Sequence, residues 1–366
     1  MNKKVLHIFG GMNRGGAELR TLDTMQPLAE KGIELEYCAL SGKKGVLDES
    51  IFAAGSKVHY CALGIFFPFK LFNLLRQNKF DTVHSHVALV SGVILLIAWL
   101  AGVKQRVAHF RSTQEVAERS LLRKFRNKVF HQLIDFFATD ILGVCQAALV
   151  AFWRKDWQKD SRCRVIYNGL KTVDYQIKDP SFWQDYAIKP NMPVIVNIAR
   201  MDPPKNHLFM VKLLAEYIMD FGNAYLVFVG KEDPQTKERI ITLAQKHNCE
   251  ELIIFAGEQS NIYPFIQNAD TLLFPSLWEG LPGAVIEAAS VGLPVVASDL
   301  PGVKEIAVQL PSVKYLSLRD NTQQWVKLLN QSITSGDQER KQSCQEFTQS
   351  QFNLNQCVEG IYAVYR

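Results

Sequence analysis

Short apolar runs alternate with longer segments of helical periodicity along the first half of the chain. Runs rich in branched and aromatic residues predict strands, and apolar residues spaced three or four apart predict amphipathic helices. The expected strands are residues 5–9, 34–40, 57–60, 82–84, 106–110, 140–144 and 164–166. The expected helices are residues 17–31, 68–78, 89–101 and 121–137. Alternation of this kind predicts a parallel sheet with helices on both faces.

The same pattern restarts after a segment at 180–193, which begins and ends in proline and has no apolar periodicity. The second set of expected strands is 194–198, 225–229, 252–255, 271–274, 294–297 and 315–316. The second set of expected helices is 207–220, 236–247, 283–291 and 322–335, and a last helical segment covers 356–365. The restart indicates a second domain of the same kind.

We therefore expect an α/β protein of two facing, Rossmann-like, doubly wound domains. The first domain spans residues 1–178 and the second spans 179–352, while 353–366 forms a C-terminal helix that crosses back to the first domain. Because ligands of such sheets bind at the carboxyl ends of the strands, the expected site is a cleft between the two domains.

Composition fits a soluble protein with ample core. The chain has 366 residues, of which 48 % are apolar and 21 % charged, which suits two domains. Its seven cysteines are dispersed and form no C-x-x-C pair, a pattern typical of reduced thiols in a cytosolic protein. No zinc-ligand spacing occurs.

Two apolar segments could be mistaken for membrane signals. The run at 5–9 is too short for a signal peptide and is interpreted as a strand. The uncharged run at 87–103 is at the lower limit of a membrane span, and a buried helix is the better interpretation because strands flank it closely. We expect a cytoplasmic protein, with peripheral contact to the inner face of the membrane.

Charge is distributed unevenly between the two halves. Residues 1–175 hold 25 Lys and Arg against 15 Asp and Glu, a net +10, whereas the remainder holds 16 against 21, a net −5. A basic first half suggests an anionic partner such as a membrane surface, a lipid diphosphate or an acidic saccharide. A solvated basic face is the alternative.

A glycine-rich segment follows the first expected strand. Residues 10–18 read Gly-Gly-Met-Asn-Arg-Gly-Gly-Ala-Glu and lead into a helix. Free backbone N–H groups and the helix dipole favour phosphate at such a position, and Gly15 and Gly16 permit close approach. The segment lacks the G-x-G-x-x-G spacing, and a plain tight turn is the alternative.

Two cations lie on one loop in the second half. Arg200 and Lys205 follow the strand 194–198, at the edge where a ligand is expected. Together they can neutralise a departing diphosphate. No D-x-D motif for a metal-bound diphosphate occurs in the chain, so these cations would carry that charge. Solvated surface cations are the alternative.

Two glutamates flank the start of a later expected helix. Glu279 lies in the loop before it and Glu287 lies within it, with Gly280 and Leu281 between them. Carboxylates so placed can accept hydrogen bonds from a sugar and from a ribose, and the helix N-terminus adds positive potential for phosphate. One exposed and one capping glutamate is the alternative.

Taken together, these features resemble the retaining GT-B glycosyltransferases of family 4, the group 1 enzymes of capsule and exopolysaccharide assembly. The resemblance runs over essentially the whole chain. Its carriers, in order, are Gly-Gly-Ala-Glu at 15–18, Val-Ile-Tyr-Asn-Gly at 165–169, Arg200 with Lys205, Gly230, Glu279 with Glu287, and Gly-Leu-Pro-Val-Val-Ala-Ser-Asp at 292–299. Each is weak alone, whereas the ordered set is specific.

The resemblance implies a role for each matching residue. It places Gly16 near the donor phosphates or the acceptor, counts Gly15 and Gly230 with it among the donor-binding residues, and assigns the diphosphate to Arg200 and Lys205. Glu279 would contact the transferred sugar, Glu287 the ribose hydroxyls, and Gly280 and Leu281 the donor. Retention by attack on the face that the diphosphate leaves requires no protein nucleophile. The resemblance also implies UDP as the nucleotide, no metal and no cofactor.

Two residues depart from the family pattern, one in each half of the chain. Arg111 stands where many members have a histidine, with His109 two residues earlier, and an arginine there is expected to contact phosphate rather than act as a base. Pro282 stands where many relatives have a glycine. His86, in the segment His84-Ser85-His86, is an expected acceptor contact, and a structural histidine pair is the alternative.

The segment 119–137 combines basic and apolar residues. Arg119, Arg123, Lys124, Arg126 and Lys128 interleave with leucines and phenylalanines, and no acid interrupts residues 119–131. This pattern is typical of an amphipathic helix on an anionic membrane. A core-facing helix with a basic outer face is the alternative. No nucleic-acid-binding module is recognisable.

We therefore predict a hexosyltransferase that moves sugar from a nucleotide diphosphate donor to a lipid-linked or oligosaccharide acceptor in envelope polysaccharide synthesis. Two alternatives share the scaffold: a nucleotide-sugar epimerase or hydrolase, and a catalytically silent partner subunit. An NAD-dependent oxidoreductase is disfavoured because the glycine fingerprint is missing.

Overall fold

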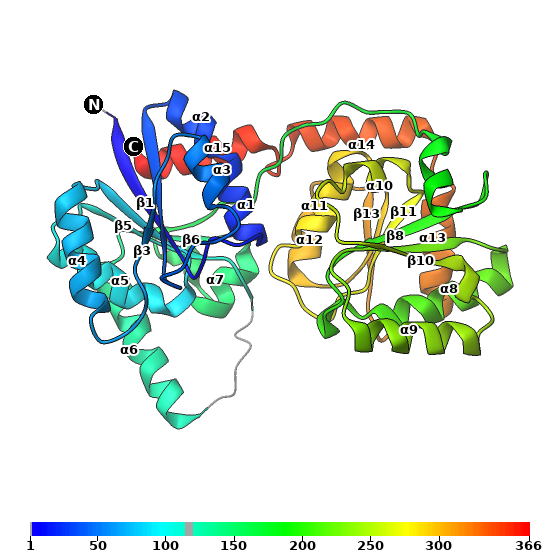
Figure 1. The fold of residues 1–366 in the computed structure, drawn as a ribbon, viewed down its shortest axis with the longest axis horizontal. Helices are drawn as coiled ribbons and strands as arrows, with labels where there is room; N and C mark the ends of the chain where they lie inside the picture. The colour runs from blue at the N-terminus through cyan, green and yellow to red at the C-terminus, as the bar shows by residue number, and fades with distance from the viewer. Residues whose placement is uncertain (1, 114–119) are drawn as a thin grey trace. The chain divides into compact units, whose positions relative to one another are not determined.

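The computed structural model describes residues 2–113 and 120–366, and its chain divides into two compact units (Figure 1). Unit 1 comprises Met1–Gly169 together with Leu354–Arg366, and unit 2 comprises Leu170–Asn353. The sequence placed this division at 178/179. Each unit is an α/β body built on its own parallel sheet, so the predicted fold class is confirmed.

Unit 1 is built on a seven-stranded parallel sheet of order β3-β2-β1-β4-β5-β6-β7. Its strands are β1 (Lys3–Phe9), β2 (Ile33–Ala39), β3 (Val58–Tyr60), β4 (Thr82–Ser85), β5 (Gln105–Phe110), β6 (Asp140–Gly143) and β7 (Cys163–Val165). Strand order reverses between β1 and β4, which are hydrogen-bonded neighbours in register from Val5 with Thr82 to Ile8 with Ser85. This reversal is the topological switch point of the sheet, where ligands of doubly wound folds bind.

Helices connect the strands of unit 1. They are α1 (Gly16–Asp23), α2 (Met25–Glu30), α3 (Asp48–Ala53), α4 (Phe67–Asn78), α5 (Ser91–Leu100), α6 (Leu121–Phe137) and α7 (Gln146–Phe152). Helix α5, from the long apolar run, is largely buried and packs against both α4 and α6. Its Gly92 lies so close to α6 that an added Cβ would meet the Phe130 carbonyl oxygen at 2.4 Å. The run is therefore a core helix. No helix of the described residues is both long and apolar enough to cross a bilayer.

The C-terminal helix α15 (Leu354–Tyr365) belongs to the core of unit 1 (Figure 1). Five of its apolar side chains join the buried cluster beneath β1 and β2, and Tyr365 adds a fully buried ring. Lys3 at the start of β1 donates a 2.6 Å hydrogen bond to the Tyr365 carbonyl oxygen. The two ends of unit 1 are thus tied together across 362 residues of sequence separation.

Unit 2 is built on a six-stranded parallel sheet of order β10-β9-β8-β11-β12-β13. The strands are β8 (Val194–Ile198), β9 (Tyr225–Val229), β10 (Ile253–Gly257), β11 (Thr271–Phe274), β12 (Val295–Ser298) and β13 (Val313–Leu316). The helices are α8 (His207–Phe221), α9 (Pro234–Lys246), α10 (Tyr263–Asn268), α11 (Gly283–Ser290), α12 (Pro301–Ala307), α13 (Thr322–Ile333) and α14 (Asp337–Gln349). Its switch point lies between β8 and β11.

The structure confirms all thirteen predicted strands and differs in the helices. The single helix expected at 17–31 is two, because Thr24 ends α1 and its hydroxyl bonds the Thr21 carbonyl. The sequence analysis missed several helices: α3, α7, α10, α12 and α14. Four of these are only six or seven residues long, too short to establish a period.

Candidate active site

Two of the predicted residues of unit 2 meet at its switch point. Lys205 follows β8 and Glu279 follows β11, and the Lys205 ammonium forms an ion pair with the Glu279 carboxylate. Their side chains are 20 % and 18 % exposed, so the pair is screened from bulk water yet reachable by a ligand. The structure brings together two residues that lie 74 positions apart in the sequence.

Local backbone geometry fixes the loop that carries Lys205. Pro203–Lys205 forms one turn of 3-10 helix, and Asn206 then adopts the left-handed conformation with φ 59°. The Asn206 amide donates to the Pro275 carbonyl at 3.1 Å, and the Leu277 N–H donates to the Pro204 carbonyl at 2.7 Å. These bonds join the loop after β8 to the loop after β11, so Lys205 and Glu279 are held by a common backbone frame.

Arg200 lies on the same loop but makes a different contact. Its guanidinium pairs with Asp202 at 2.9 Å and its side chain is 71 % exposed. The structure therefore does not hold Arg200 against the Lys205–Glu279 pair. An arginine this exposed has the reach and freedom to turn toward a bound anion, at the cost of a weak surface ion pair.

The remaining predicted donor residues of unit 2 lie along the loop after β11 and in α11. Glu287 is in α11 and half-buried, whereas Leu281 is buried. A Cβ added to Gly302 would lie 2.0 Å from the Gly280 carbonyl oxygen, so the start of α12 packs directly on this loop. Gly280 and Leu281 thus have a structural role besides the predicted donor contact.

Gly230 has a packing reason for being glycine. Its φ is +146°, and an added Cβ would lie 2.1 Å from the Ala199 carbonyl oxygen. The loop after β9 therefore presses against the loop that carries Arg200, with the Met201 N–H bonding the Lys231 carbonyl at 2.9 Å.

His207 is a polar group beside the candidate site that the sequence analysis did not single out. It begins α8, is buried, and neither ring nitrogen has a hydrogen-bond partner among the described residues. Burial, with a smaller contribution from Lys205, lowers the pKa of His207 to about 4, so the ring is neutral. Its place two residues after Lys205 was the available signal.

The predicted residues of unit 1 lie at the switch point of the first sheet. The glycine-rich segment follows β1, and His86 comes directly after β4, its ring stacked on Phe9 with centroids 4.2 Å apart. Gly15 caps α1 under the Glu18 carboxylate, which would lie 2.3 Å from an added Cβ. A Cβ on Gly16 would meet nothing within 4 Å, so the backbone there borders open space.

Arg111 is held by three neutral groups. It donates to His86 Nδ1 at 3.2 Å, to the Asn168 amide oxygen at 2.8 Å and to the Thr21 hydroxyl at 3.0 Å. Burial lowers the pKa of Arg111 to about 10, which still leaves it charged at neutral pH. Burial raises the pKa of the nearby Glu18 carboxyl. The sequence analysis missed Thr21, whereas Asn168 lies in a segment that carried the resemblance.

Three histidines at this edge lie close enough to share a metal ion. Nitrogens of His7, His84 and His86 lie within 4.8 Å of one another. His86, however, accepts from the Arg111 cation, and its other nitrogen is engaged with His7 at 2.9 Å. A fixed positive charge beside the nitrogens opposes a second cation. The expectation of a metal-free protein stays a prediction.

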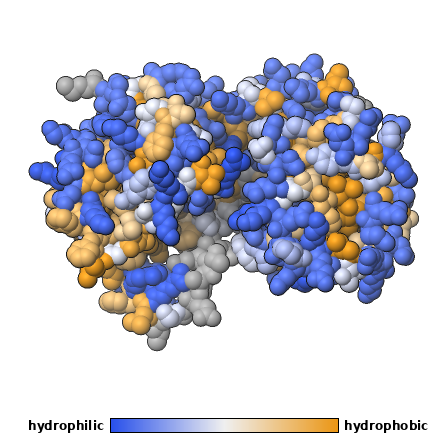
Figure 2. Space-filling model, in the orientation of Figure 1, coloured by the Kyte–Doolittle hydropathy of each residue, from blue (hydrophilic) through white to orange (hydrophobic). Residues whose placement is uncertain are grey.

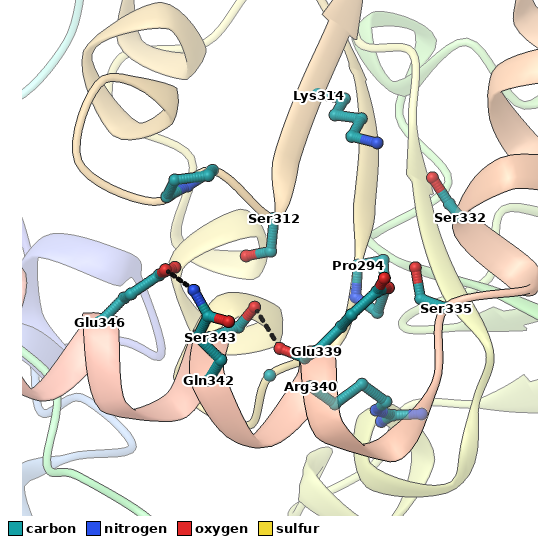
Figure 3. A pocket seen from close by; sticks show the side chains of 12 residues that line it. Pro294, Ser312, Lys314, Ser332, Ser335, Glu339, Arg340, Gln342, Ser343 and Glu346 are labelled. Carbon is teal, nitrogen blue, oxygen red and sulfur yellow. Dashed lines mark hydrogen bonds between the residues drawn. The ribbon is translucent and has the colours of Figure 1, made fainter.

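A cavity in unit 2 lies away from these residues (Figure 3). It measures about 240 Å³ and opens at the amino ends of β12 and β13, with Ser312, Lys314 and Glu339 among its lining. No predicted site residue lines it. Because ligands of doubly wound sheets bind at the carboxyl ends, this cavity is not the candidate site.

Two family models together match most of the chain. A model of group 1 glycosyl transferases matches residues 180–350, and a model of glycosyltransferase family 4 matches residues 14–173. The chain is 31 % identical over 373 residues to the capsular polysaccharide biosynthesis glycosyltransferase CapH of Staphylococcus aureus, covering 99 % of this chain and 98 % of CapH. It is 26 % identical over 249 residues to the UDP-Gal:alpha-D-GlcNAc-diphosphoundecaprenol alpha-1,3-galactosyltransferase of Escherichia coli, covering 63 % of this chain and 61 % of that protein.

Among solved structures, Anabaena HepE in complex with UDP superposes with a TM-score of 0.82 at 18 % identity, covering 99 % of both chains. Two Rossmann-like units with loops converging at their switch points define the GT-B class of fold. The chain belongs to the group 1, family 4 glycosyltransferases, and it is a glycosyltransferase.

Proposed function

We propose that the protein transfers a hexose-type sugar from a UDP-sugar, with retention of anomeric configuration, to a lipid-linked or oligosaccharide acceptor in capsule or exopolysaccharide synthesis. The single observation that carries the proposal is the Lys205–Glu279 pair at the switch point of unit 2. In a bound nucleotide sugar, the cation can pair with the diphosphate and the adjacent carboxylate can accept hydrogen bonds from the sugar hydroxyls.

The chemistry assigned to unit 2 is stabilisation of the leaving diphosphate. Lys205 would exchange part of its interaction with Glu279 for the β-phosphate, and Arg200 would leave Asp202 to take up the remaining charge. Glu279 then has acceptor capacity for sugar hydroxyls, and Glu287 for the ribose. Such preorganised charge is effective where negative charge grows in the transition state.

Retention is proposed from kinship and from chemistry. The family resemblance implies it, and the related Escherichia coli enzyme is named for an alpha product made from UDP-Gal. The proposed route has the acceptor oxygen attack the same face that the diphosphate leaves, and the leaving phosphate takes the acceptor proton. No metal and no protein nucleophile enter this scheme.

The acceptor and the pathway are proposed from the same relatives. CapH is a capsular polysaccharide enzyme by name, and the Escherichia coli relative acts on a diphosphoundecaprenol acceptor by name. In unit 1, the charged Arg111 beside His86 is suited to the diphosphate of such a lipid-linked acceptor.

Peripheral attachment to an anionic membrane is part of the proposal. Helix α6 packs on α5 through the turn around Phe130, yet Leu122, Phe125 and Phe136 are 83 %, 70 % and 81 % exposed. Ile65, Phe66 and Phe69, around the start of α4, are also exposed. Figure 2 shows apolar side chains gathered over the region of α4 to α6. Together with the lysines and arginines of α6, these groups suit a bilayer interface.

Donor choice and product together test the proposal. A panel of UDP-, GDP- and ADP-sugars is screened by the shift in melting temperature, and the best donor is then incubated with a polyprenyl-diphosphate sugar acceptor. We expect stabilisation by a UDP-sugar and an axial glycosidic linkage by NMR. An equatorial linkage contradicts retention, free sugar without acceptor product indicates a hydrolase, and stabilisation by another nucleotide alone contradicts UDP.

A further inference from the structure

A continuous chain of hydrogen-bonded side chains crosses the switch point of unit 1. It begins at Arg111 and passes through four histidine rings and one tyrosine. These residues come from β1, from β4 and the position directly after it, from β5 and from helix α15. The members, in order, are Arg111, His86, His7, Tyr365, His84 and His109. The final member, Nε2 of His109, is buried and has no hydrogen-bond partner among the described residues.

The arginine fixes the direction of the chain. A guanidinium is only a donor, so Nδ1 of His86 must accept at 3.2 Å, and the His86 proton therefore sits on Nε2. Its partner among the described residues is Nδ1 of His7, which lies 2.9 Å away and accepts this proton. His7 then carries its own proton on Nε2, directed at the Tyr365 oxygen at 3.0 Å.

The phenol carries the same direction onward. Once its oxygen accepts from His7, the Tyr365 hydroxyl donates to Nδ1 of His84 at 2.5 Å. His84 then donates through Nε2 to Nδ1 of His109 at 3.0 Å. If His109 and His84 donated in the opposite direction, the Tyr365 oxygen would accept from both His7 and His84, and its own proton would have no acceptor. The single direction therefore leaves one unsatisfied group, the His109 Nε2–H.

This arrangement requires neutral histidines, and their surroundings keep them neutral. His7, His84 and His109 are each about 1 % exposed. Burial, with Arg111 contributing, lowers the pKa of His7 to about 3 and holds the pKa of the other rings well below the ordinary value. A neutral imidazole has one donor and one acceptor, which is what each internal position of the chain uses.

This series of hydrogen-bonded side chains orients the Arg111 guanidinium. Bonds to His86, Asn168 and Thr21 use one N–H on each of its three nitrogens. Two of its five N–H groups, one on each terminal nitrogen, therefore have no partner among the residues that the structure describes. Among the described residues no carboxylate forms an ion pair with Arg111. A charged, oriented fork with two remaining donors matches the geometry of a phosphate oxygen pair.

We propose that Tyr365 is a positioning residue for the acceptor side: its hydroxyl sets the tautomers of the histidine chain, so that His86 presents a lone pair to Arg111 and holds its fork for a diphosphate. Without the hydroxyl, His7 loses its acceptor and its proton can shift to Nδ1. His86 would then turn a proton toward Arg111 Nε–H, and two facing donors repel. This inference rests on the proposed lipid-diphosphate acceptor.

The first measurement needs no activity. In protein labelled with ¹⁵N-histidine, long-range ¹H–¹⁵N correlation spectra distinguish the two tautomers. We expect His7, His84, His86 and His109 all in the Nε2–H form in the wild type. A predominant Nδ1–H form at His7 or His86 overturns the proposal. Because this measurement uses unmutated protein, it does not depend on any variant folding.

The second measurement follows binding at Arg111 itself. Inorganic pyrophosphate is titrated while the Arg111 Nε–H signal is observed, in a Lys205→Ala background that weakens the donor side. Tyr365→Phe is compared with Tyr362→Phe, the same change on the same helix at a ring that packs on Lys31. We expect about a tenfold weaker pyrophosphate affinity for Tyr365→Phe alone, the scale of one hydrogen bond.

Equal affinity in Tyr365→Phe and wild type overturns the positioning role. The proposed function fails separately: absence of transfer to a polyprenyl-diphosphate acceptor, with tautomers and pyrophosphate binding as expected, would leave Tyr365 as a positioning residue for another anion. In the transfer assay, Tyr365→Phe is expected to raise the acceptor KM with the donor KM unchanged.

Discussion

Lys205 and Glu279 form an ion pair across the neighbouring strand ends β8 and β11, at the point where the strand order of the second sheet reverses. The Lys205 ammonium also lies over the Phe274 ring, 5.3 Å from its centroid. A ligand that binds at this switch point therefore meets an ammonium group held between a carboxylate and an aromatic ring.

Lys205→Ala is expected to lower kcat/KM by about 2–4 kcal/mol of transition-state free energy, because the leaving diphosphate loses a preorganised cation. Lys237→Ala is a matched control: Lys237 pairs with Glu232 at 2.6 Å and lies over the Phe255 ring, but follows β9. Steady-state kinetics on the folded variants measure kcat/KM for both. An equal loss of kcat/KM in the two variants would contradict a specific role for Lys205.

Gly16 and Gly230 are expected to respond differently to alanine. Gly16→Ala should keep or raise the melting temperature, because the new Cβ meets nothing and alanine favours helix, while kcat/KM falls as the Cβ obstructs a ligand. Gly230→Ala should instead destabilise the fold by about 2 kcal/mol or more, because of its φ of +146° and the Ala199 carbonyl. Calorimetry and kinetics separate the two, and an unaltered kcat/KM for Gly16→Ala would contradict close ligand approach there.

Stability of the isolated chain should fall as the pH is lowered from 7.5 toward 5. The pKa values of His7, His84, His86 and His109 are lowered in the folded state. Below about pH 6.5, the ordinary pKa of an exposed histidine, the unfolded state therefore binds more protons than the folded state. Each histidine adds a slope of about 1.4 kcal/mol per pH unit to the free energy of unfolding within that window, and nothing above it. Urea denaturation at stepped pH measures this slope.

A variant isolates one proton of that slope. His109→Gln, at the end of the histidine chain, should reduce proton uptake on unfolding by about one between pH 5 and 6.5. His247→Gln removes an exposed histidine and serves as the control. A stability that is flat from pH 7.5 to 5 in the wild type would contradict neutral, buried histidines.

The protein should co-sediment with anionic vesicles in a salt-sensitive manner. Neutralising Arg123, Lys124 and Arg126 with glutamine should weaken binding at least about tenfold, because each basic group near a charged surface contributes about 1 kcal/mol. The control neutralises three exposed lysines of unit 2: Lys246, Lys327 and Lys341. Equal binding by both triple variants would exclude α6 as the membrane contact.

The sequence predicted the architecture because strands of parallel sheets are short, apolar and separated by regular intervals. It did not predict α14, whose thirteen residues are mostly polar and offer little periodicity. It assigned Lys205 and Glu279 to one donor site and His86 and Arg111 to the acceptor side, but only the fold shows that Lys205 and Glu279 form an ion pair.

The histidine chain illustrates what sequence analysis cannot supply. His7 and Tyr365 are 358 residues apart, and neither belongs to a local motif. Their contact depends on α15 packing into unit 1 and on the register that sets β1 beside β4. The direction of the hydrogen bonds then follows from Arg111, which can only donate. This inference requires the three-dimensional contacts of all six side chains.

The most direct test of the central claim is a crystal structure of the protein with UDP bound. We predict that the diphosphate contacts the ammonium of Lys205 and the guanidinium of Arg200, and that the ribose hydroxyls donate to Glu287. UDP bound with its diphosphate elsewhere, for example in the cavity beside Ser312 and Lys314, would contradict the account.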